Sequence, residues 1–248
     1  MSIESREDFE GLKEAGRIVR IALSEMEKAV RSGITTAELD EIGADVLMRY
    51  GARSAPMLVY GFPGAACISV NDEIVHGVPG GRVIQGSDLV KLDVTVEKDG
   101  YMADAAITVP VPPVSEERRE LIACAKRAFD RAMNVTRAGF RVRDIGRAVE
   151  KEVRRSGFVV IRDGLAGHGI GRTIHEEPTV PNYYDFRARQ RLTNGLVITV
   201  EPMIATGSGR ALQAADGWTI KTADGSWAAH YEHTVVVTRG TPILLTAA

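Results

Sequence analysis

Cysteine is scarce in this sequence, since Cys67 and Cys124 are the only two among 248 residues. Two cysteines are too few for a disulfide-rich scaffold or a zinc finger, and this favours a reducing compartment. Long apolar runs are also missing, because no stretch approaches the roughly 18 residues that a membrane helix needs. The first segment, MSIESREDFEGLKEAG, is charged from Glu4 onward and has no apolar signal region. We therefore expect a soluble cytoplasmic protein without a targeting segment.

The sequence has no large excess of charge of either sign. Its 31 lysines and arginines nearly balance its 33 aspartates and glutamates, which gives a formal net charge of −2 at neutral pH. Such a balance implies no general attraction to nucleic acid or to an anionic membrane. What the sequence does contain is apolar material, 44% of its residues, and this is enough for one sizeable core. We expect a single domain over residues 1–248.

The stretch from Lys91 to Val109, KLDVTVEKDGYMADAAITV, has the pattern of a β-hairpin. Alternating and β-branched residues lie on both sides of the turn sequence Lys98-Asp99-Gly100. Two acids, Asp93 and Asp104, stand inside the strands. Strands disfavour aspartate, and a buried carboxylate without a partner is costly, so both acids need a reason.

The register of this hairpin decides how the two acids meet. A loop of Lys98-Asp99 puts Asp93 directly opposite Asp104, and a loop of Asp99-Gly100 makes them diagonal neighbours. Both registers place the two carboxylates on the same face of the sheet. Two like charges so close share a proton or hold a cation, unless the face is exposed and both acids are solvated.

The order of expected elements occurs twice in the chain. Before the hairpin, apolar spacing predicts a helix from Ser5 to Gly33 and a shorter helix from Thr35 or Thr36 to Gly51. After the hairpin, it predicts a helix from Ser115 to about Arg137 and a short helix that ends at Gly157. At an offset of 106 residues, Arg31, Gly33, Leu39 and Gly51 fall on Arg137, Gly139, Ile145 and Gly157. This pattern predicts an internal duplication with halves at about 1–112 and 113–248.

The duplication indicates where further acids lie. An apolar strand over 196–200 ends at Glu201, and another over 231–238 opens with Glu232. Aligning ADAAITV with YEHTVVV puts Asp104 on Glu232, and aligning LVKLDV with LVITVE puts Asp93 beside Glu201. Four inward carboxylates at one interface repel one another unless divalent cations lie between them.

The segment GLAGHGIGRTIHEEP, over 164–178, adds histidines to these acids. A neutral imidazole among carboxylates suits a transition metal better than calcium. The predicted ligand set, able to hold two metals, is Asp93, Asp104, His168, Glu201 and Glu232. Two such metals can activate a water and polarise a carbonyl, which indicates hydrolysis. The pattern alone favours a surface role for the loop residue His76 and leaves His230 and His233 as structural or supporting residues.

Five segments, in this order and spacing, resemble the type I methionine aminopeptidases of the pita-bread metallopeptidases: SVNDEIVHGVP, KLDVTVEKDGYMAD, GHGIGRTIHEEP, TVEPM and YEHTVVVT. The resemblance runs from about Ser5 to Thr241. It implies an α+β fold of the pita-bread type, which is an internally duplicated unit with a curved antiparallel sheet and helices on its outer face. It also implies a dinuclear metal site at the pseudo-twofold axis.

The resemblance gives each predicted ligand a role. Asp93 would hold one metal, Asp104 and Glu232 would bridge both, and His168 and Glu201 would complete the second. The two divalent ions would be cobalt, manganese, iron or zinc. Glu201 would also be the general base for a bridging water that attacks the scissile carbonyl.

The resemblance also implies residues that contact the substrate. His76 and His175 match two family histidines, one near the scissile amide nitrogen and one near its carbonyl oxygen, where donors lower the barrier as charge develops. This match replaces the surface interpretation of His76. Phe62, Cys67 and Trp218 fall at pocket positions, and an aromatic lining suits a thioether side chain.

The sequence departs from the family pattern at five positions. Pro56 and Val59 stand where the family often has a cysteine and a tyrosine, and Ile174 stands where an aromatic residue is common. Ala105 and Ala106 follow Asp104 where a hydroxyl residue is usual. These differences concern the side-chain pocket and the support of Asp104, and they leave the ligand set intact.

The resemblance predicts one catalytic domain that removes the N-terminal methionine from nascent proteins when the second residue is small. Its expected partners are the N-termini of nascent polypeptides and the ribosome, without nucleic acid or membrane, and we expect a monomer. Two alternatives remain open. One is another pita-bread peptidase, of the Xaa-Pro type, although those generally carry an extra N-terminal domain. The other is a non-catalytic pita-bread protein that binds protein or RNA.

Overall fold

The structure is a computed structural model that describes residues 1–247, in which helices pack against one large antiparallel sheet. The helices are α1 (Arg6–Ala29), α2 (Thr36–Arg49), α3 (Ala55–Tyr60), α4 (Glu116–Met133) and α5 (Val142–Arg155). The strands are β1 (Arg53–Ser54), β2 (Cys67–Val70), β3 (Glu73–Val75), β4 (Leu89–Lys98), β5 (Tyr101–Pro110), β6 (Val159–Val160), β7 (Ala166–Gly169), β8 (Glu176–Pro181), β9 (Val197–Val200), β10 (Met203–Ala205), β11 (Ala211–Gln213), β12 (Ile220–Thr222), β13 (Ala228–His230), β14 (Glu232–Val236) and β15 (Ile243–Leu244). Among residues 1–247, no helix combines the length and the apolar character that crossing a membrane requires.

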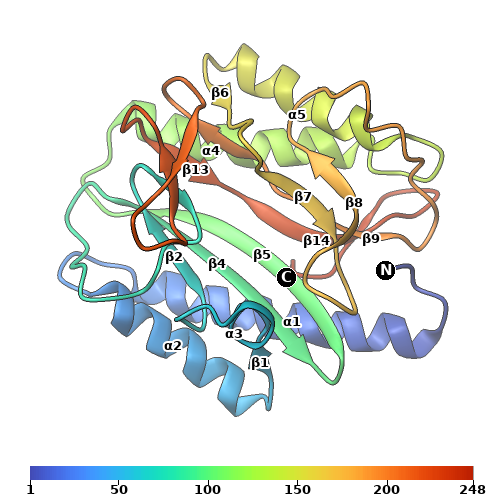
Figure 1. Cartoon of the computed structure of the whole chain (residues 1–248), viewed down its shortest axis with the longest axis horizontal. Helices are drawn as coiled ribbons and strands as arrows, with labels where there is room; N and C mark the ends of the chain where they lie inside the picture. Colours follow the sequence, from blue (N-terminus) through green and yellow to red (C-terminus); the bar gives the residue numbers. More distant parts are fainter. Residues whose placement is uncertain (248) are drawn as a thin grey trace.

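The large sheet has the strand order β1-β4-β5-β14-β9-β7-β8, with β2 beside β4 and β15 beside β14. Every strand pair in it is antiparallel. Figure 1 shows α1 and α2 on one side of the central strands and α4 and α5 on the other. The first helix pair packs on β4 and β5, and the second packs on β9 and β14, so the core has two main parts. The expected α+β fold is confirmed.

Alternation along the strands separates an apolar face from a polar one. On β4, Val90, Leu92, Val94 and Val96 all belong to the core beneath α1 and α2. Because successive side chains point to opposite faces, Asp93 lies on the face away from the helices. The same parity holds on β5, where Ala103 and Ala105 face the helices. The acids therefore gather on the face of the sheet opposite to α1 and α2.

The repeat in element order is visible in the structure. Helices α2 and α5 differ by 106 residues at both of their ends, as the sequence offset predicts. The division into halves at about 1–112 and 113–248 stays a prediction. The long helices were expected to reach Gly33 and about Arg137, and this was wrong: α1 ends at Ala29 and α4 at Met133. After α1 the backbone of Val30 is extended, and after α4 the Thr136 hydroxyl donates to the carbonyl of Ala132.

The hairpin adopts the second of the two possible registers. Lys98 pairs with Tyr101, so Asp99-Gly100 is the two-residue loop, and both loop residues have positive φ (50° and 83°). Asp93 therefore stands opposite Ala106, and Asp104 stands opposite Thr95. The two acids are diagonal neighbours on one face.

The sheet aligns the acids in a row across four strands. Ala106 on β5 pairs with Asp93 on one side and with Glu232 on the other. The next strand continues the row, because Val200 pairs with His233 and this puts Glu201 beside Glu232. The methyl group of Ala106 is small, so it leaves space between the two flanking carboxylates. The alanine at this position, which departs from the family pattern, therefore does not disturb the arrangement of the acids.

Lys91 is a lysine buried in the core, with 1% of its surface exposed. Its ammonium group donates to the carbonyl oxygens of Asn71, at 2.7 Å, and Ala228, at 3.3 Å. Burial lowers the pKa of Lys91 from 10.5 to about 7. The folded protein therefore binds this proton less tightly than the unfolded chain does.

Lys91 should make the protein more stable as the pH rises from 7 to about 10. In that range the unfolded chain holds the proton and the folded chain has released it, so raising the pH favours the folded state. At about 1.4 kcal/mol per pKa unit, the gain is of the order of a few kcal/mol. Urea unfolding of metal-free protein at several pH values measures this gain. Lys91→Met should remove this contribution to the rise of unfolding free energy with pH. If the unfolding free energy rose equally with pH in both proteins, Lys91 would not be its source.

Candidate metal centre

One cavity of about 550 Å³ opens on the polar face of the sheet. All ten site residues predicted from the sequence line it: Phe62, Cys67, His76, Asp93, Asp104, His168, His175, Glu201, Trp218 and Glu232. These residues come from strands and loops between positions 62 and 232, and the sheet register brings them together. Cys67 pairs directly with Asp93, so the cavity joins an apolar part to an acidic part.

The four carboxylates of the cavity are buried, and burial controls their charge. It raises the pKa of Asp93, Glu201 and Glu232 well above their usual range, and the negative charge of Asp104 raises each of them further. The pKa of Asp104 rises less, to about 6. Without a cation, several of these acids would be protonated at neutral pH. A bound cation must therefore displace protons from the cluster.

Hydrogen bonds fix both the carboxylate and the backbone of Asp104. Burial raises its pKa, and hydrogen bonds from the Thr95 hydroxyl and from the Asp93 carboxyl group oppose that rise. Its backbone is fixed by Thr234, whose hydroxyl accepts from the Asp104 amide and donates to the Asp104 carbonyl, both at 2.8 Å. The hydroxyl groups near Asp104 thus come from the two neighbouring strands, not from Ala105 and Ala106.

His168 presents one nitrogen to the acids. Its Nδ1 lies 2.9 Å from the Gly169 carbonyl oxygen, which fixes Nδ1 as the donor and leaves the lone pair on Nε2. That Nε2 is 3.6 Å from Oε1 of Glu201. The Thr199 hydroxyl donates to the same Oε1 at 2.7 Å and accepts from the His168 amide at 2.9 Å. Thr199 therefore fixes the position of His168 relative to Glu201.

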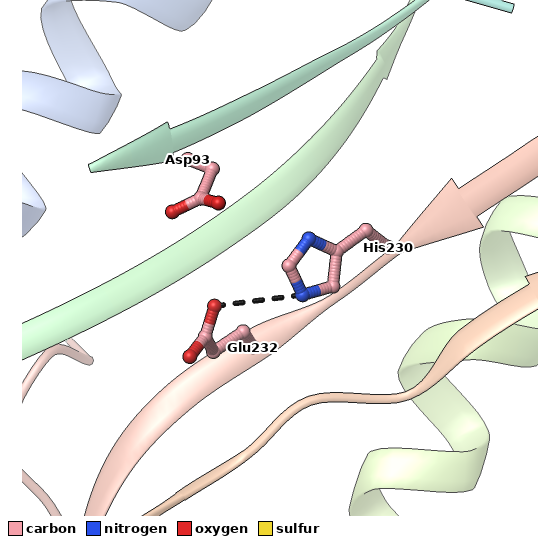
Figure 2. A group of neighbouring side chains, drawn as sticks. All are labelled: Asp93, His230 and Glu232. Carbon is pink, nitrogen blue, oxygen red and sulfur yellow. Dashed lines mark ion pairs between the residues drawn. The ribbon is translucent and has the colours of Figure 1, made fainter. Parts of the chain in front are cut away.

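The donor atoms of the cluster fit a metal ion. Two groups of three side chains each have ligand atoms within 4.8 Å of one another: Asp104, His168 and Glu232, and Asp93, His230 and Glu232. Figure 2 shows the second group, with both carboxylates on one side of the His230 ring. Oδ1 of Asp104 and Oε1 of Glu232 are buried and have no hydrogen-bond partner among residues 1–247. Unpaired buried oxygens of this kind are costly in a protein that holds no cation there.

His76 and His175 lie at the wall of the cavity, near the acids. His76 has a left-handed backbone with φ of 57°, and it lines the cavity. The His175 ring stacks edge-on against the His168 ring at 4.2 Å between centroids. Burial lowers the pKa of His76 to about 4 and also lowers that of His175. Both rings are therefore neutral at pH 7, and each can offer an N–H donor.

Tyr60 is a site residue that the sequence did not indicate. It is the last residue of α3, and its hydroxyl lies 2.5 Å from Nδ1 of His175. A phenol is a stronger acid than a neutral imidazole, so Tyr60 donates and the proton of His175 sits on Nε2. Val59, where the family often has a tyrosine, is half exposed and does not line the cavity. Spacing along α3 could not reveal this contact with a residue 115 positions away.

Tyr60→Phe should lower turnover while metal content stays at the wild-type value. The change removes only the hydroxyl that sets the tautomer of His175, and one hydrogen bond of about 1 kcal/mol corresponds to roughly fivefold in rate. Steady-state kinetics with a methionyl peptide, together with elemental analysis, measures both quantities. Tyr184→Phe alters an exposed tyrosine outside the cavity and serves as the control. Equal turnover in Tyr60→Phe and wild type would show that this hydrogen bond does not matter.

The apolar part of the cavity has aromatic walls. Phe62 and Trp218 meet edge to face, with their centroids 5.2 Å apart. Cys67 is buried beside them, and burial raises the pKa of its thiol, so it is a neutral apolar group at pH 7. Ile174 and Pro56, two of the departures from the family pattern, also line the cavity. The arrangement offers a compact apolar space next to the acids.

The two remaining histidines of the C-terminal strands differ in their surroundings. His233 was expected to be structural or supporting, and its ring bonds with the Thr246 and Tyr231 hydroxyls, at 2.8 and 3.1 Å, away from the acids. His230 was also expected to be structural or supporting, and it lines the cavity with 1% of its surface exposed. Its spacing of two residues from Glu232 on an extended chain was the available signal, since such residues share a face.

A buried group of carboxylates and imidazoles at the bottom of a cavity is the kind of site that metal-dependent hydrolases use. Residues 10–239 match the profile of metallopeptidase family M24, and the chain belongs to this family. It is 44% identical over 248 residues to methionine aminopeptidase 2 of Bacillus subtilis, with 99% of each chain covered. It is also 38% identical over 244 residues to the methionine aminopeptidase of Clostridium perfringens, with 98% of each covered.

Solved structures give the same result. The methionine aminopeptidase of Thermotoga maritima superposes with a TM-score of 0.96 at 34% identity, and each chain is covered completely. The prolidase of Pyrococcus furiosus has a TM-score of 0.80 at 21% identity, and the match covers 99% of this chain but only 65% of the prolidase. The second comparison shows the shared pita-bread fold alone.

Proposed function

We propose that this protein is a metal-dependent aminopeptidase that removes the N-terminal methionine from polypeptides whose second residue is small. The observation that carries the proposal is the cavity in which a buried acid and imidazole cluster adjoins an apolar pocket. Similarity to methionine aminopeptidases over the full length of the chain supports it. A non-catalytic role is disfavoured because all five predicted ligands are present and face one cavity.

The proposed cofactor is a pair of divalent ions, of cobalt, manganese, iron or zinc. Asp93, Asp104 and Glu232 would hold one ion, and Asp104, His168, Glu201 and Glu232 the other. Glu232 belongs to both groups of close donor atoms, which supports two neighbouring ions over one. When bound, the ions would supply an activated water and polarise the scissile carbonyl.

The residues around the cluster have distinct proposed roles. Glu201 accepts the proton of the attacking water, since its second oxygen remains available while Oε1 accepts from Thr199. His175 donates from Nε2 to the carbonyl oxygen of the substrate, because its Nδ1 accepts from Tyr60. His76 lies near the scissile amide nitrogen. Donors that are already oriented require no reorganisation as charge develops.

The apolar part of the cavity is the proposed site of the methionine side chain. Phe62 and Trp218 provide aromatic faces and Cys67 a third wall, and a thioether makes favourable contacts with such surfaces. A cavity of about 550 Å³ can accept the end of a chain but not a folded loop. This favours cleavage of N-terminal residues over internal cleavage.

The proposed substrates are newly made polypeptides, and they indicate where the protein works. We infer that it acts in the cytoplasm on the N-termini of nascent polypeptides, with the ribosome as a candidate partner. Both cysteines are unpaired and buried, which is compatible with a reducing compartment. The proposed working form is a monomer, in which one chain supplies every predicted site residue.

The test is a small peptide panel with protein that has been stripped by chelator and reloaded with manganese or cobalt. Met-Ala-Ser should be cleaved only after reloading, while Met-Lys-Ser, Leu-Ala-Ser and Ala-Pro should not. Cleavage of Leu-Ala-Ser would contradict the assigned pocket, and cleavage of Ala-Pro would favour an Xaa-Pro peptidase. No cleavage of any peptide by protein with bound metal would overturn the proposed function.

A further inference from the structure

We infer that His230 is a sixth protein ligand of the metal centre and binds, through its imidazole, the ion held by Asp93 and Glu232. This inference rests on the proposed metal centre but adds a residue that the family resemblance does not supply. Three independent observations carry it: the unsatisfied ring nitrogens of His230, the distances from its Nε2 to the acids, and the way its backbone is fixed.

Both nitrogens of the His230 ring lack a hydrogen-bond partner among residues 1–247. The ring is 1% exposed, so water from the surface does not replace the missing partners. Leaving a buried polar atom unpaired costs about 1–3 kcal/mol, and buried polar atoms are therefore nearly always paired. An ion bound at Nε2, the nitrogen that faces the acids, would give one of these two atoms its partner.

The distances around His230 fit coordination better than hydrogen bonding. Its Nε2 lies 3.5 Å from Oε2 of Glu232 and 4.0 Å from Oε2 of Glu201. Donor atoms that share one ion, with bonds of about 2.0–2.2 Å, stand roughly 3–4 Å apart. The Nε2 of His168, a predicted ligand, stands at a similar 3.6 Å from Glu201. Figure 2 shows a ring nitrogen of His230 turned toward Glu232, with Asp93 on the same side of the ring as Glu232.

The backbone of His230 is fixed at this place. The Thr108 hydroxyl accepts from the His230 amide at 2.9 Å and donates to the His230 carbonyl at 2.8 Å. Thr234 holds the backbone of Asp104 in the same way on the other side of Glu232. A predicted ligand and His230 thus receive equivalent backbone support. Such support limits the movement of the imidazole, as a ligand requires.

A second imidazole changes which metals the centre prefers. With His230 bound, each ion of the pair has one nitrogen donor, whereas the five predicted ligands give a nitrogen to only one ion. Imidazole favours zinc, cobalt and iron over manganese, while carboxylates alone suit manganese. His230 should therefore shift the preference of the Asp93 position away from manganese.

The direct test is a scalar coupling between metal and nitrogen. Protein labelled with ¹⁵N-histidine, stripped and loaded with two equivalents of ¹¹³Cd²⁺, should show one-bond ¹¹³Cd–¹⁵N coupling on two imidazoles, those of His168 and His230. His230→Gln should lose one of the two couplings. His233→Gln, which changes a buried histidine that already has two hydrogen-bond partners, is the matched control and should keep both.

The outcomes separate this inference from the proposed function. Coupling to a single imidazole, unchanged in His230→Gln, would overturn the sixth ligand and leave the five-ligand centre intact. Coupling to no imidazole would overturn both. Coupling to two imidazoles in a protein that cleaves none of the panel peptides would support the sixth ligand and reject the aminopeptidase function.

A second readout distinguishes a ligand from a residue that only positions Glu232. The affinities for Co²⁺ and Mn²⁺ are measured by competition with a chelating dye. If His230 binds metal, His230→Gln should weaken Co²⁺ binding about tenfold more than Mn²⁺ binding. Equal weakening of both ions would indicate a positioning role and would overturn the inference. Thermal unfolding of each variant in chelator verifies that the fold is retained.

Discussion

Glu232→Ala is expected to lose both bound metal and peptide hydrolysis. Glu232 belongs to both groups of close donor atoms, and it is 2% exposed in the middle of the row of acids. Its removal leaves Asp93 and Asp104 without the carboxylate that belongs to the donor group of each. Metal stoichiometry should fall from two ions toward zero or one, with turnover at or below about a thousandth of wild type. Elemental analysis after gel filtration and the Met-Ala-Ser assay measure these quantities.

Glu97→Ala is the matched control for this prediction. Glu97 is also a buried glutamate, at 4% exposed, and lies on β4 on the face that carries Asp93. It pairs with Arg53 at 2.7 Å and lies outside the cavity. It should keep both metals and full activity, although it should lose some stability. If Glu232→Ala retained two ions, Glu232 would not bridge the centre.

Glu201→Gln is expected to keep the fold and most of the pocket while turnover falls by about 10²–10⁴-fold. The amide keeps the size of the side chain and the oxygen that accepts from Thr199, but it cannot take the proton of an attacking water. The loss should appear in kcat with little change in KM, since the apolar pocket is untouched. Steady-state kinetics in buffer with saturating metal measures it.

The comparison variant for Glu201→Gln is Glu177→Gln. Glu177 also lines the cavity, but it is exposed and belongs to neither group of close donor atoms. Its change should leave kcat near the wild-type value. Turnover near wild type in Glu201→Gln would mean that another group takes the proton.

Much of the site could be predicted because its signals were local. Asp93 and Asp104 were conspicuous as acids inside strands, and their shared face followed from the period of two in a strand. The exact register could not be predicted, since Asp99 had to adopt positive φ for one of two possible loops. The repeated order of helices and strands indicated an internal duplication, and the fold class followed from the family resemblance.

Other parts depended on contacts that no local pattern encodes. Tyr60 reaches His175 only because α3 packs beside the cavity, and short strands such as β10 and β13 carry too few residues for a pattern. His230 was visible in the sequence but had no evident role there. Its burial and its missing hydrogen bonds became apparent only in three dimensions. The sequence thus indicated the four acids and three of the four imidazoles that line the cavity, but not the place of the fourth, His230.

The acids of the centre are divided evenly between the two copies of the repeat, but the imidazoles closest to them are not. Asp93 and Asp104 come from the first copy and Glu201 and Glu232 from matching strands of the second, whereas His168 and His230 both belong to the second. The predicted duplication implies an ancestor whose two identical halves formed a symmetric cage of oxygen donors, suited to hard cations. Divergence of the second half would then have added nitrogen donors on one side of the cage. In evolutionary terms, duplication would supply the cage, and later asymmetry would supply its preferred metal and a direction for its substrate.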